Sequence, residues 1–177
     1  MANAEELLPF ILKWEGGFVN DPLDRGGATN MGVTLPAWKA YGYDKTGDKK
    51  VDVSDLRKLT KSDVLHVLRV GYWNRWKADQ INNQAIANTL VDWVWGSGAW
   101  GIKIPQRLLG VTQDGIVGSK TIEALNKQNA KTFLEKLYKA RYDYLQGIVN
   151  RNPSQKRFIN GWNNRMNDLV KFNQKII

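Results

Sequence analysis

Apolar residues recur at helical spacing along most of the chain. Between residues 4 and 14 they fall on one side of a helix, at Leu7, Leu8, Ile11, Leu12 and Trp14. Similar patterns predict further helices over residues 60–76, 84–95, 99–109, 119–128, 130–149 and 155–173. Ser, Thr, Asn or Asp stands near the start of several of these segments, where such side chains cap free backbone N–H groups. The chain is therefore expected to be mainly α.

One short region near the N-terminus departs from this spacing. Gly16 and Gly17 follow Glu15, and they predict that the first helix stops there in a positive-φ conformation. Residues 18–34 are dense in turn residues and predict a short β-hairpin. Its strand positions are expected at Phe18, Val19, Met31 and Val33. The predicted architecture is a helical bundle with a small N-terminal β-hairpin, of the α+β type.

Composition and charge exclude some classes of site and favour some classes of partner. The chain has 177 residues, enough for one domain with a core, or for one domain and a small appendage. Its net charge of +9 favours an anionic partner, such as nucleic acid, an anionic membrane surface or an acidic cell-wall polymer. The absence of cysteine excludes disulfides and thiolate metal sites. No apolar stretch approaches the ~20 residues of a membrane span, and the acidic start of the chain predicts no cleavable export signal.

Three residues around the predicted hairpin suggest acid catalysis. Glu15 stands at the end of the first helix, where its apolar neighbours could exclude water. Asp24 lies beyond a turn that can fold back over this helix end, and the Thr29 hydroxyl could hold a water. Hydrolysis of a glycosidic bond needs an acid for the leaving oxygen and a second group that stabilises positive charge or activates water. A surface glutamate near a helix end is the alternative for Glu15.

The same segment resembles a known family. Residues 15–34 read EGGFVNDPLDRGGATNMGVT, which is similar to the signature of family 108 glycoside hydrolases, the lysozyme-like N-acetylmuramidases of bacteria and their phages. The resemblance implies that Glu15 is the catalytic glutamate. Phage-type lysozymes place a Glu, an Asp and a Thr in this order, which Glu15, Asp24 and Thr29 match. It also implies a lysozyme-like fold, with the hairpin beside an active-site cleft.

The second half of the chain carries a weaker resemblance. Residues 106–125 predict a helix, a turn at Asp114-Gly115 and a second helix, and they resemble the small peptidoglycan-binding module of many wall hydrolases. Residues 157–165 resemble the end of family 108 chains. These matches divide the chain into a catalytic region, 1–100, and a helical peptidoglycan-binding-like region, 101–177, packed into the same globular unit. Whether the second region binds the wall or only packs stays open.

A loop rich in aspartate resembles a degenerate calcium loop. The acids and Thr46 fall at positions 1, 3, 5, 9 and 12 of an EF-hand-like segment: Asp44, Thr46, Asp48, Asp52 and Asp55. Lys49 stands where such a loop needs glycine, so a solvated charged turn is favoured over a bound ion. The lone histidine, His66, has no second His or Cys to share a metal. We therefore predict no metal site and no cofactor.

Aromatic residues gather in the middle of the chain. Tyr72, Trp93 and Trp95 are candidates for stacking on a glycan, because this region would form the far wall of a lysozyme-like cleft. The same region also contains Trp73, Trp76 and Trp100. Most of these six rings are expected to lie in the core.

The function expected from the resemblance is hydrolysis of the peptidoglycan β-1,4 bond between N-acetylmuramic acid and N-acetylglucosamine. The alternative is a non-catalytic peptidoglycan-binding or secretion-associated protein that keeps the fold. Binding to nucleic acid is not expected, because basic residues are scattered instead of forming one dense run. A monomeric prophage endolysin fits these expectations. It would be made in the cytoplasm and act at the wall after release by a holin or another exporter.

Overall fold

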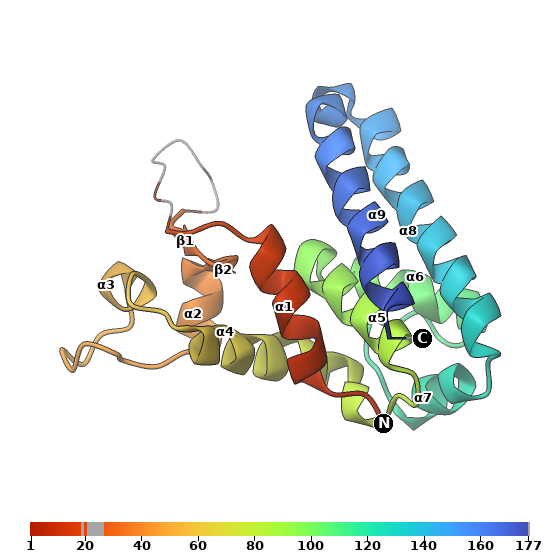
Figure 1. Ribbon diagram of the computed structural model, residues 1–177, viewed down its shortest axis with the longest axis horizontal. Coiled ribbons are helices and arrows are strands. Elements are labelled where there is room, and N and C mark those ends of the chain that lie inside the picture. The colour runs from red at the N-terminus through yellow and green to blue at the C-terminus, as the bar shows by residue number, and fades with distance from the viewer. Residues whose placement is uncertain (19, 21–26, 177) are drawn as a thin grey trace. The chain divides into compact units, whose positions relative to one another are not determined.

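The computed structural model describes residues 1–18, 20 and 27–176. Of the residues that the structure describes, 69% are helical, and the sheet among them is one two-stranded antiparallel hairpin (Figure 1). This confirms the predicted mainly-α architecture. The chain divides into two compact units, residues 3–75 and residues 76–177 with the first two residues.

The unit of residues 3–75 contains short helices and the hairpin. Its elements are α1 (Ala4–Trp14), β1 (Thr29–Asn30), β2 (Val33–Thr34), α2 (Leu35–Tyr41), α3 (Val53–Leu56), α4 (Lys61–Leu68) and η1 (Arg69–Trp73). The predicted helix over 60–76 therefore ends as an α-helix at Leu68, continues as the π-helical turn η1, and closes in the 3-10 turn η2 (Asn74–Trp76).

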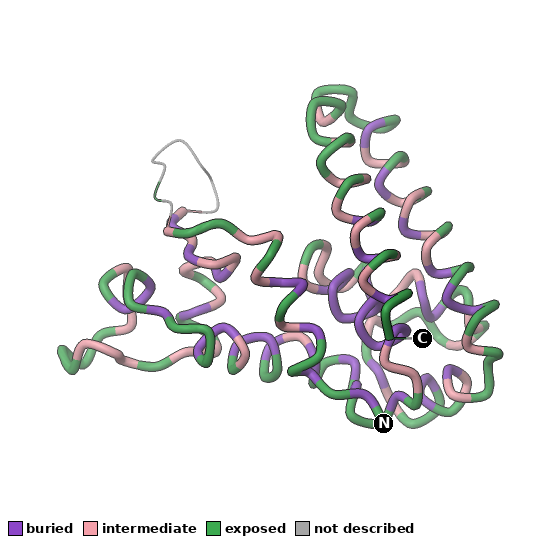
Figure 2. The backbone as a smooth tube through the Cα atoms, in the orientation of Figure 1, coloured by how far each residue is buried: buried purple, intermediate pink, exposed green. Residues whose placement is uncertain are grey.

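Side-chain caps set the starts of these helices. The Asn3 side chain accepts a hydrogen bond from the backbone of Glu5, and that of Thr34 accepts one from Ala37. Thr60 and Asp63 form a reciprocal capping box at α4. Helix α1 packs on α4 and buries Leu7, Phe10 and Ile11, so its apolar stripe faces the core, as the periodicity predicts (Figure 2).

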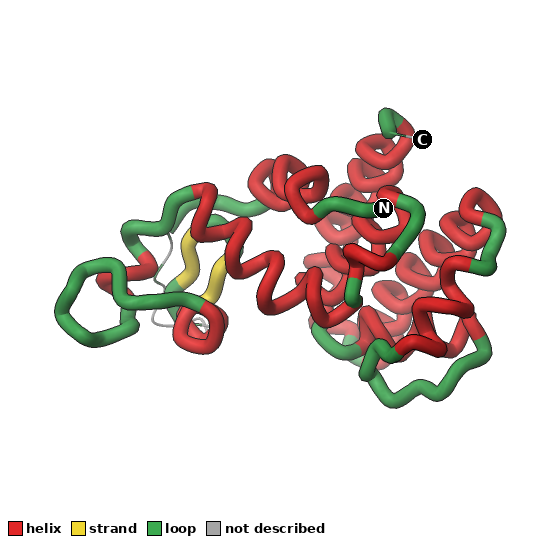
Figure 3. The backbone as a smooth tube through the Cα atoms, turned by 90° about the horizontal axis from the view of Figure 1, so that it is seen from below, coloured by secondary structure: helices red, strands yellow, loops and turns green. Residues whose placement is uncertain are grey.

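The described residues of the unit 76–177 form helices joined by loops, with no strand among them (Figure 3). Its elements are η3 (Ala78–Gln80), α5 (Gln84–Ser97), α6 (Trp100–Leu109), α7 (Ser119–Asn126), α8 (Ala130–Arg151), η4 (Pro153–Phe158) and α9 (Ile159–Gln174). Helix α5 is buried from Ala85 to Val94 and packs against α6, α8 and α9. Gly101 lets α6 approach α5 closely, because a Cβ at Gly101 would lie 2.6 Å from the backbone nitrogen of Val94 on α5.

Buried polar residues connect the long helices of this unit. Asp92 on α5 is 0% exposed and accepts hydrogen bonds from Arg141 on α8, at 2.8 Å, and from Arg165 on α9, at 2.7 Å. A second group joins the same helices, since the Asn173 amide donates to Thr89 Oγ1 and to the Tyr138 hydroxyl. Such groups are stable in a core only when they are paired.

Within the described residues, no helix combines the length and the apolar character that a membrane span requires.

Three local predictions about the first unit are wrong. Gly16 and Gly17 do not adopt positive φ; the helix ends because Glu15 is already extended. Met31 is not a strand residue, because it stands in the hairpin turn with a φ of 50°. Val33 is a strand residue, as predicted, and Phe18 is not. Val19 lies outside the described residues.

Candidate active site

Glu15 is the residue at which the chain leaves helix α1. Its backbone is extended, with φ −103° and ψ 136°, while its N–H still donates to the Ile11 carbonyl at 3.1 Å. The last helical hydrogen bond therefore holds the backbone of Glu15 at the end of α1. The residues that follow Glu15 leave the helix axis. The residue is only partly exposed to solvent.

The β-hairpin closes against this helix end. Met31 and Gly32, with φ values of 50° and 81°, form a two-residue turn between the paired residues Asn30 and Val33. Positive φ at both central positions is the pattern of a type I′ turn, which matches the twist of a hairpin. The Met31 N–H donates to the Gly16 carbonyl at 2.9 Å. The turn is thus tied to the residue next to Glu15.

Gly32 touches the Glu15 side chain directly. A Cβ at this position would lie 2.4 Å from Glu15 Cγ and 2.9 Å from its Oε2. Those distances are too short for any side chain, so the absence of one at Gly32 makes room for the carboxylate. Positive φ imposes the same choice of residue independently. Gly32 therefore helps to position Glu15.

Asn30 holds the hairpin on the rest of its unit. It is 7% exposed, and its Nδ2 donates to the Leu56 carbonyl at 2.8 Å. Thr29, beside it, pairs with Thr34 across the two strands and is partly exposed. Glu15 and Thr29 therefore belong to one unit and to adjoining segments of it. Asp24, the third predicted residue, lies outside the described residues.

Sequence reasoning did not identify Gly32 and Asn30. Gly32 had one available signal, because a glycine at the second of two residues between short β-branched segments favours a tight hairpin. The signal was weak, since Met31 replaces the Asn or Asp usual at the first position. The contact of Asn30 with Leu56 joins residues 26 positions apart and has no local signal.

The three predicted aromatic residues lie in different surroundings. Tyr72, on η1, belongs to the same unit as Glu15, and its ring lies 6.2 Å from that of Tyr41. Partial burial raises the pKa of the Tyr72 hydroxyl. Trp93 and Trp95 belong to the other unit. Trp93 is 0% exposed, with its ring 5.8 Å from Tyr144, so its burial gives no support to direct glycan contact, whereas Trp95 is partly exposed.

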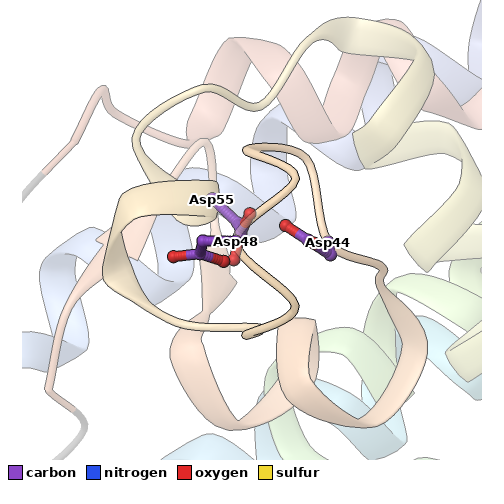
Figure 4. Close-up of side chains that lie close together, drawn as sticks. All are labelled: Asp44, Asp48 and Asp55. Atoms are coloured by element: carbon purple, nitrogen blue, oxygen red, sulfur yellow. The ribbon is translucent and has the colours of Figure 1, made fainter.

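The aspartate loop brings three carboxylates together. Oxygen atoms of Asp44, Asp48 and Asp55 lie within 4.8 Å of one another (Figure 4). These acids also organise the loop: Asp44 accepts hydrogen bonds from three backbone N–H groups, those of Thr46, Gly47 and Lys49, and Asp55 accepts from those of Lys45, Thr46 and Asp52.

These bonds give the acids a structural use that needs no ion. Burial raises the pKa of Asp44, but the backbone bonds lower it by more, which favours the charged acceptor. Lys49 has a φ of 65° at the position where a calcium loop has glycine. Asp52 instead caps α3 through the backbone of Ser54. His66 has a structural contact too, because its Nε2 lies 3.0 Å from the Tyr41 carbonyl.

Comparison with known proteins places this geometry in a family. Residues 8–98 match the model of glycosyl hydrolase 108, and residues 100–167 match that of a predicted peptidoglycan domain. The structure of SagA from Brucella abortus is similar, with a TM-score of 0.80 and 31% sequence identity, over 97% of this chain and 94% of that one. No match was found among proteins of curated function.

These similarities confirm the lysozyme-like, mainly-α fold expected from the sequence. Together, the hydrolase match and the peptidoglycan domain support a glycosidase that acts on peptidoglycan, and they support peptidoglycan as its partner. The first match covers Glu15, Thr29 and the hairpin turn, and therefore the described part of the predicted site. The chain belongs to the glycosyl hydrolase 108 family.

Proposed function

We propose that this protein is an N-acetylmuramidase that uses Glu15 as its general acid. It would cleave the β-1,4 bond between N-acetylmuramic acid and N-acetylglucosamine in peptidoglycan. The observation that carries the proposal is the contact between the Glu15 side chain and Gly32 at the turn of the hairpin. A carboxylic acid that lies against the hairpin turn is suited to protonate a leaving glycosidic oxygen, because proton transfer requires a defined position of the acid.

Thr29 and Asp24 are proposed to serve the other half of the reaction. Bond breaking leaves positive charge on the sugar, so a second group must stabilise that charge or activate water on the opposite face. Thr29 is suited to hold the water, since it lies in a strand that Asn30 anchors to the Leu56 carbonyl. Asp24 would act as the second carboxylate, by stabilising charge or, with Thr29, by positioning the water.

The rest of the chain is proposed to engage the polymer. Peptidoglycan carries free carboxylates on its stem peptides, which suits a net charge of +9. Tyr72 and Trp95, both partly exposed, remain the proposed glycan contacts outside the acid site. We keep the division into a catalytic region, 1–100, and a helical peptidoglycan-binding-like region, 101–177, as part of the proposal.

The proposal is tested by removing the acid and keeping the shape of its side chain. Glu15→Gln should lower the release of reducing ends from purified peptidoglycan by about 100- to 10,000-fold, the usual contribution of a general acid. Glu6→Gln is the matched control, because Glu6 is exposed on the same helix. It should keep the parent rate.

Two results would contradict the proposal. Full activity of Glu15→Gln would remove Glu15 from the mechanism. Sedimentation of the unmodified protein with insoluble peptidoglycan, without any release of reducing ends, would instead favour the non-catalytic wall-binding alternative.

A further inference from the structure

A groove in the helical unit is formed by one face of α6 and one face of α8. It encloses about 650 Å³. Trp100, Arg107 and Leu108 line it from α6, at positions i, i+7 and i+8, so they share a helical face. Asp143, Tyr144 and Arg151 line it from α8. All six residues belong to the same compact unit and to the region that matches the peptidoglycan domain.

The groove exposes aromatic surface that the core does not use. Trp100 is 48% exposed, whereas Trp73, Trp76 and Trp93 are each 0% exposed. Lys103 Nζ lies 5.3 Å from the centre of the Trp100 ring. Tyr144 is held in place by its contact with the buried Trp93 ring at 5.8 Å. An exposed indole beside a fixed phenol offers flat apolar faces of the kind on which sugar rings stack.

The groove also carries an excess of positive charge. Arg107 and Arg151 are exposed, and neither forms an ion pair within the part of the chain that the structure describes. Arg107 Nε donates to Gln113 Oε1 at 3.1 Å, which orients its guanidinium. Asp143, the acid of the groove, already pairs with Lys139 at 2.7 Å. Guanidinium groups suit carboxylates because they can donate two parallel hydrogen bonds.

We propose that this groove binds a peptidoglycan strand, separately from the acid site around Glu15. A pyranose ring would stack on Trp100, and carboxylates of the stem peptide would pair with Arg107 and Arg151. The proposal depends on the proposed function only for the choice of polymer. A nucleic-acid surface is less compatible, because it would need basic residues spaced along a phosphate backbone, and this groove has two arginines and an acid.

Binding can be measured without hydrolysis if all variants carry Glu15→Gln. We expect Trp100→Ala to raise the Kd for sedimentation with insoluble peptidoglycan about tenfold, and Trp100→Phe to keep most of the affinity. The double variant Arg107→Gln/Arg151→Gln should also weaken binding about tenfold. Amidation of the polymer's carboxylates should weaken binding of the parent protein by the same factor of about ten. It should have little further effect on binding of the double variant.

Matched controls come from the same unit. Phe158 is 40% exposed and Arg157 lies 4.6 Å above its ring, outside the groove. Phe158→Ala and Arg157→Gln should change the Kd by less than twofold, and circular dichroism should give all variants the same helical content.

Two results would overturn the proposal. The groove variants could bind peptidoglycan as tightly as the parent, or they could lose retention of duplex DNA and keep that of peptidoglycan. Reducing-end release by the protein with native Glu15 is scored separately. Lost binding in the groove variants, together with no hydrolysis by the native protein, would refute the muramidase and leave the groove proposal standing.

Discussion

The two compact units use their carboxylates in opposite ways. In residues 3–75, the aspartates of the loop and of the helix starts bind backbone N–H groups close in sequence, as Asp44 does with Thr46 and Asp63 does with Thr60. In residues 76–177, Asp92 is fully buried and binds Arg141 and Arg165, which are 49 and 73 positions away. The acids of the first unit mainly form local turns and caps, although Asp63 also accepts from Lys45 and Tyr43. In the second unit, the buried charges of Asp92, Arg141 and Arg165 join distant helices.

The difference suggests how chemistry and stability are divided. A unit built from turns can place a side chain such as Glu15 against a hairpin, because loops reach positions that helices do not. A unit joined by buried charges resists separation of its helices, because each unpaired charge would be costly. Substitutions in the first unit should therefore affect activity first, and substitutions at Asp92 should affect stability first.

The largest effect is expected at Asp92. Burial raises the pKa of this carboxyl, but the two guanidinium groups lower it by more, so it stays charged. Asp92→Ala removes the buried carboxylate that accepts from Arg141 and Arg165, and it should lower the free energy of unfolding by about 3–5 kcal/mol in urea. Asp143→Ala removes an exposed pair with Lys139 and should cost less than about 0.5 kcal/mol. Equal losses in the two variants would end the contrast between the units.

Gly32 should give the next largest effect, and on activity. Gly32→Ala places a Cβ 2.4 Å from Glu15 Cγ at a φ of 81°. Displacing the acid by about 1 Å should lower reducing-end release about 100-fold. Gly47→Ala is the control, because Gly47 has a φ of 78° in the same unit and a Cβ there meets nothing within 4 Å. If both variants lose activity alike, backbone strain and not the Glu15 contact explains the loss.

A smaller effect should appear in the pH dependence of stability. Burial raises the pKa of Asp63, but hydrogen bonds from Lys45, Thr60 and Tyr43 lower it by more, so that the pKa falls to about 2. Because this pKa lies below that of the unfolded chain, the stabilisation is complete above about pH 5 and is lost as the pH falls through about 2. Asp63→Asn should therefore cost about 2 kcal/mol at pH 7 and almost nothing near pH 2.

Tyr43→Phe provides a graded comparison for this effect. It removes one donor to Asp63, the hydroxyl that lies 2.7 Å from Oδ1. Its cost at pH 7 should be smaller than that of Asp63→Asn, and it should fade over the same range of acid pH. A cost of Asp63→Asn that does not change between pH 7 and pH 2 would contradict the role of the charged carboxylate.

The sequence predicted features that depend on neighbours along the chain. The caps at Thr34 and Thr60 mark helix starts within a few residues, and the apolar stripe of α1 faces the core. The end of α1 was located, but its conformation was not, because Gly16 and Gly17 permit positive φ without requiring it.

The features that were missed depend on distant contacts. Nothing local to Asp92 indicates that two arginines more than 40 residues away will bury it. The turn at Met31 was also missed because of a distant contact. The hydrogen bond from Asn30 to the Leu56 carbonyl, 26 positions away, holds the hairpin in place. The position of Glu15 was therefore predicted from its motif, whereas the contact with Gly32 required the structure.

The central claim, a muramidase that works through Glu15, is tested most directly by the identity of the new sugar end. Peptidoglycan digested by the native protein is reduced with borohydride, hydrolysed in acid, and analysed for the reduced sugar. A muramidase that works through Glu15 should yield reduced muramic acid, and Glu15→Gln should yield almost none. Reduced glucosamine as the product, or an undiminished yield from Glu15→Gln, would contradict it.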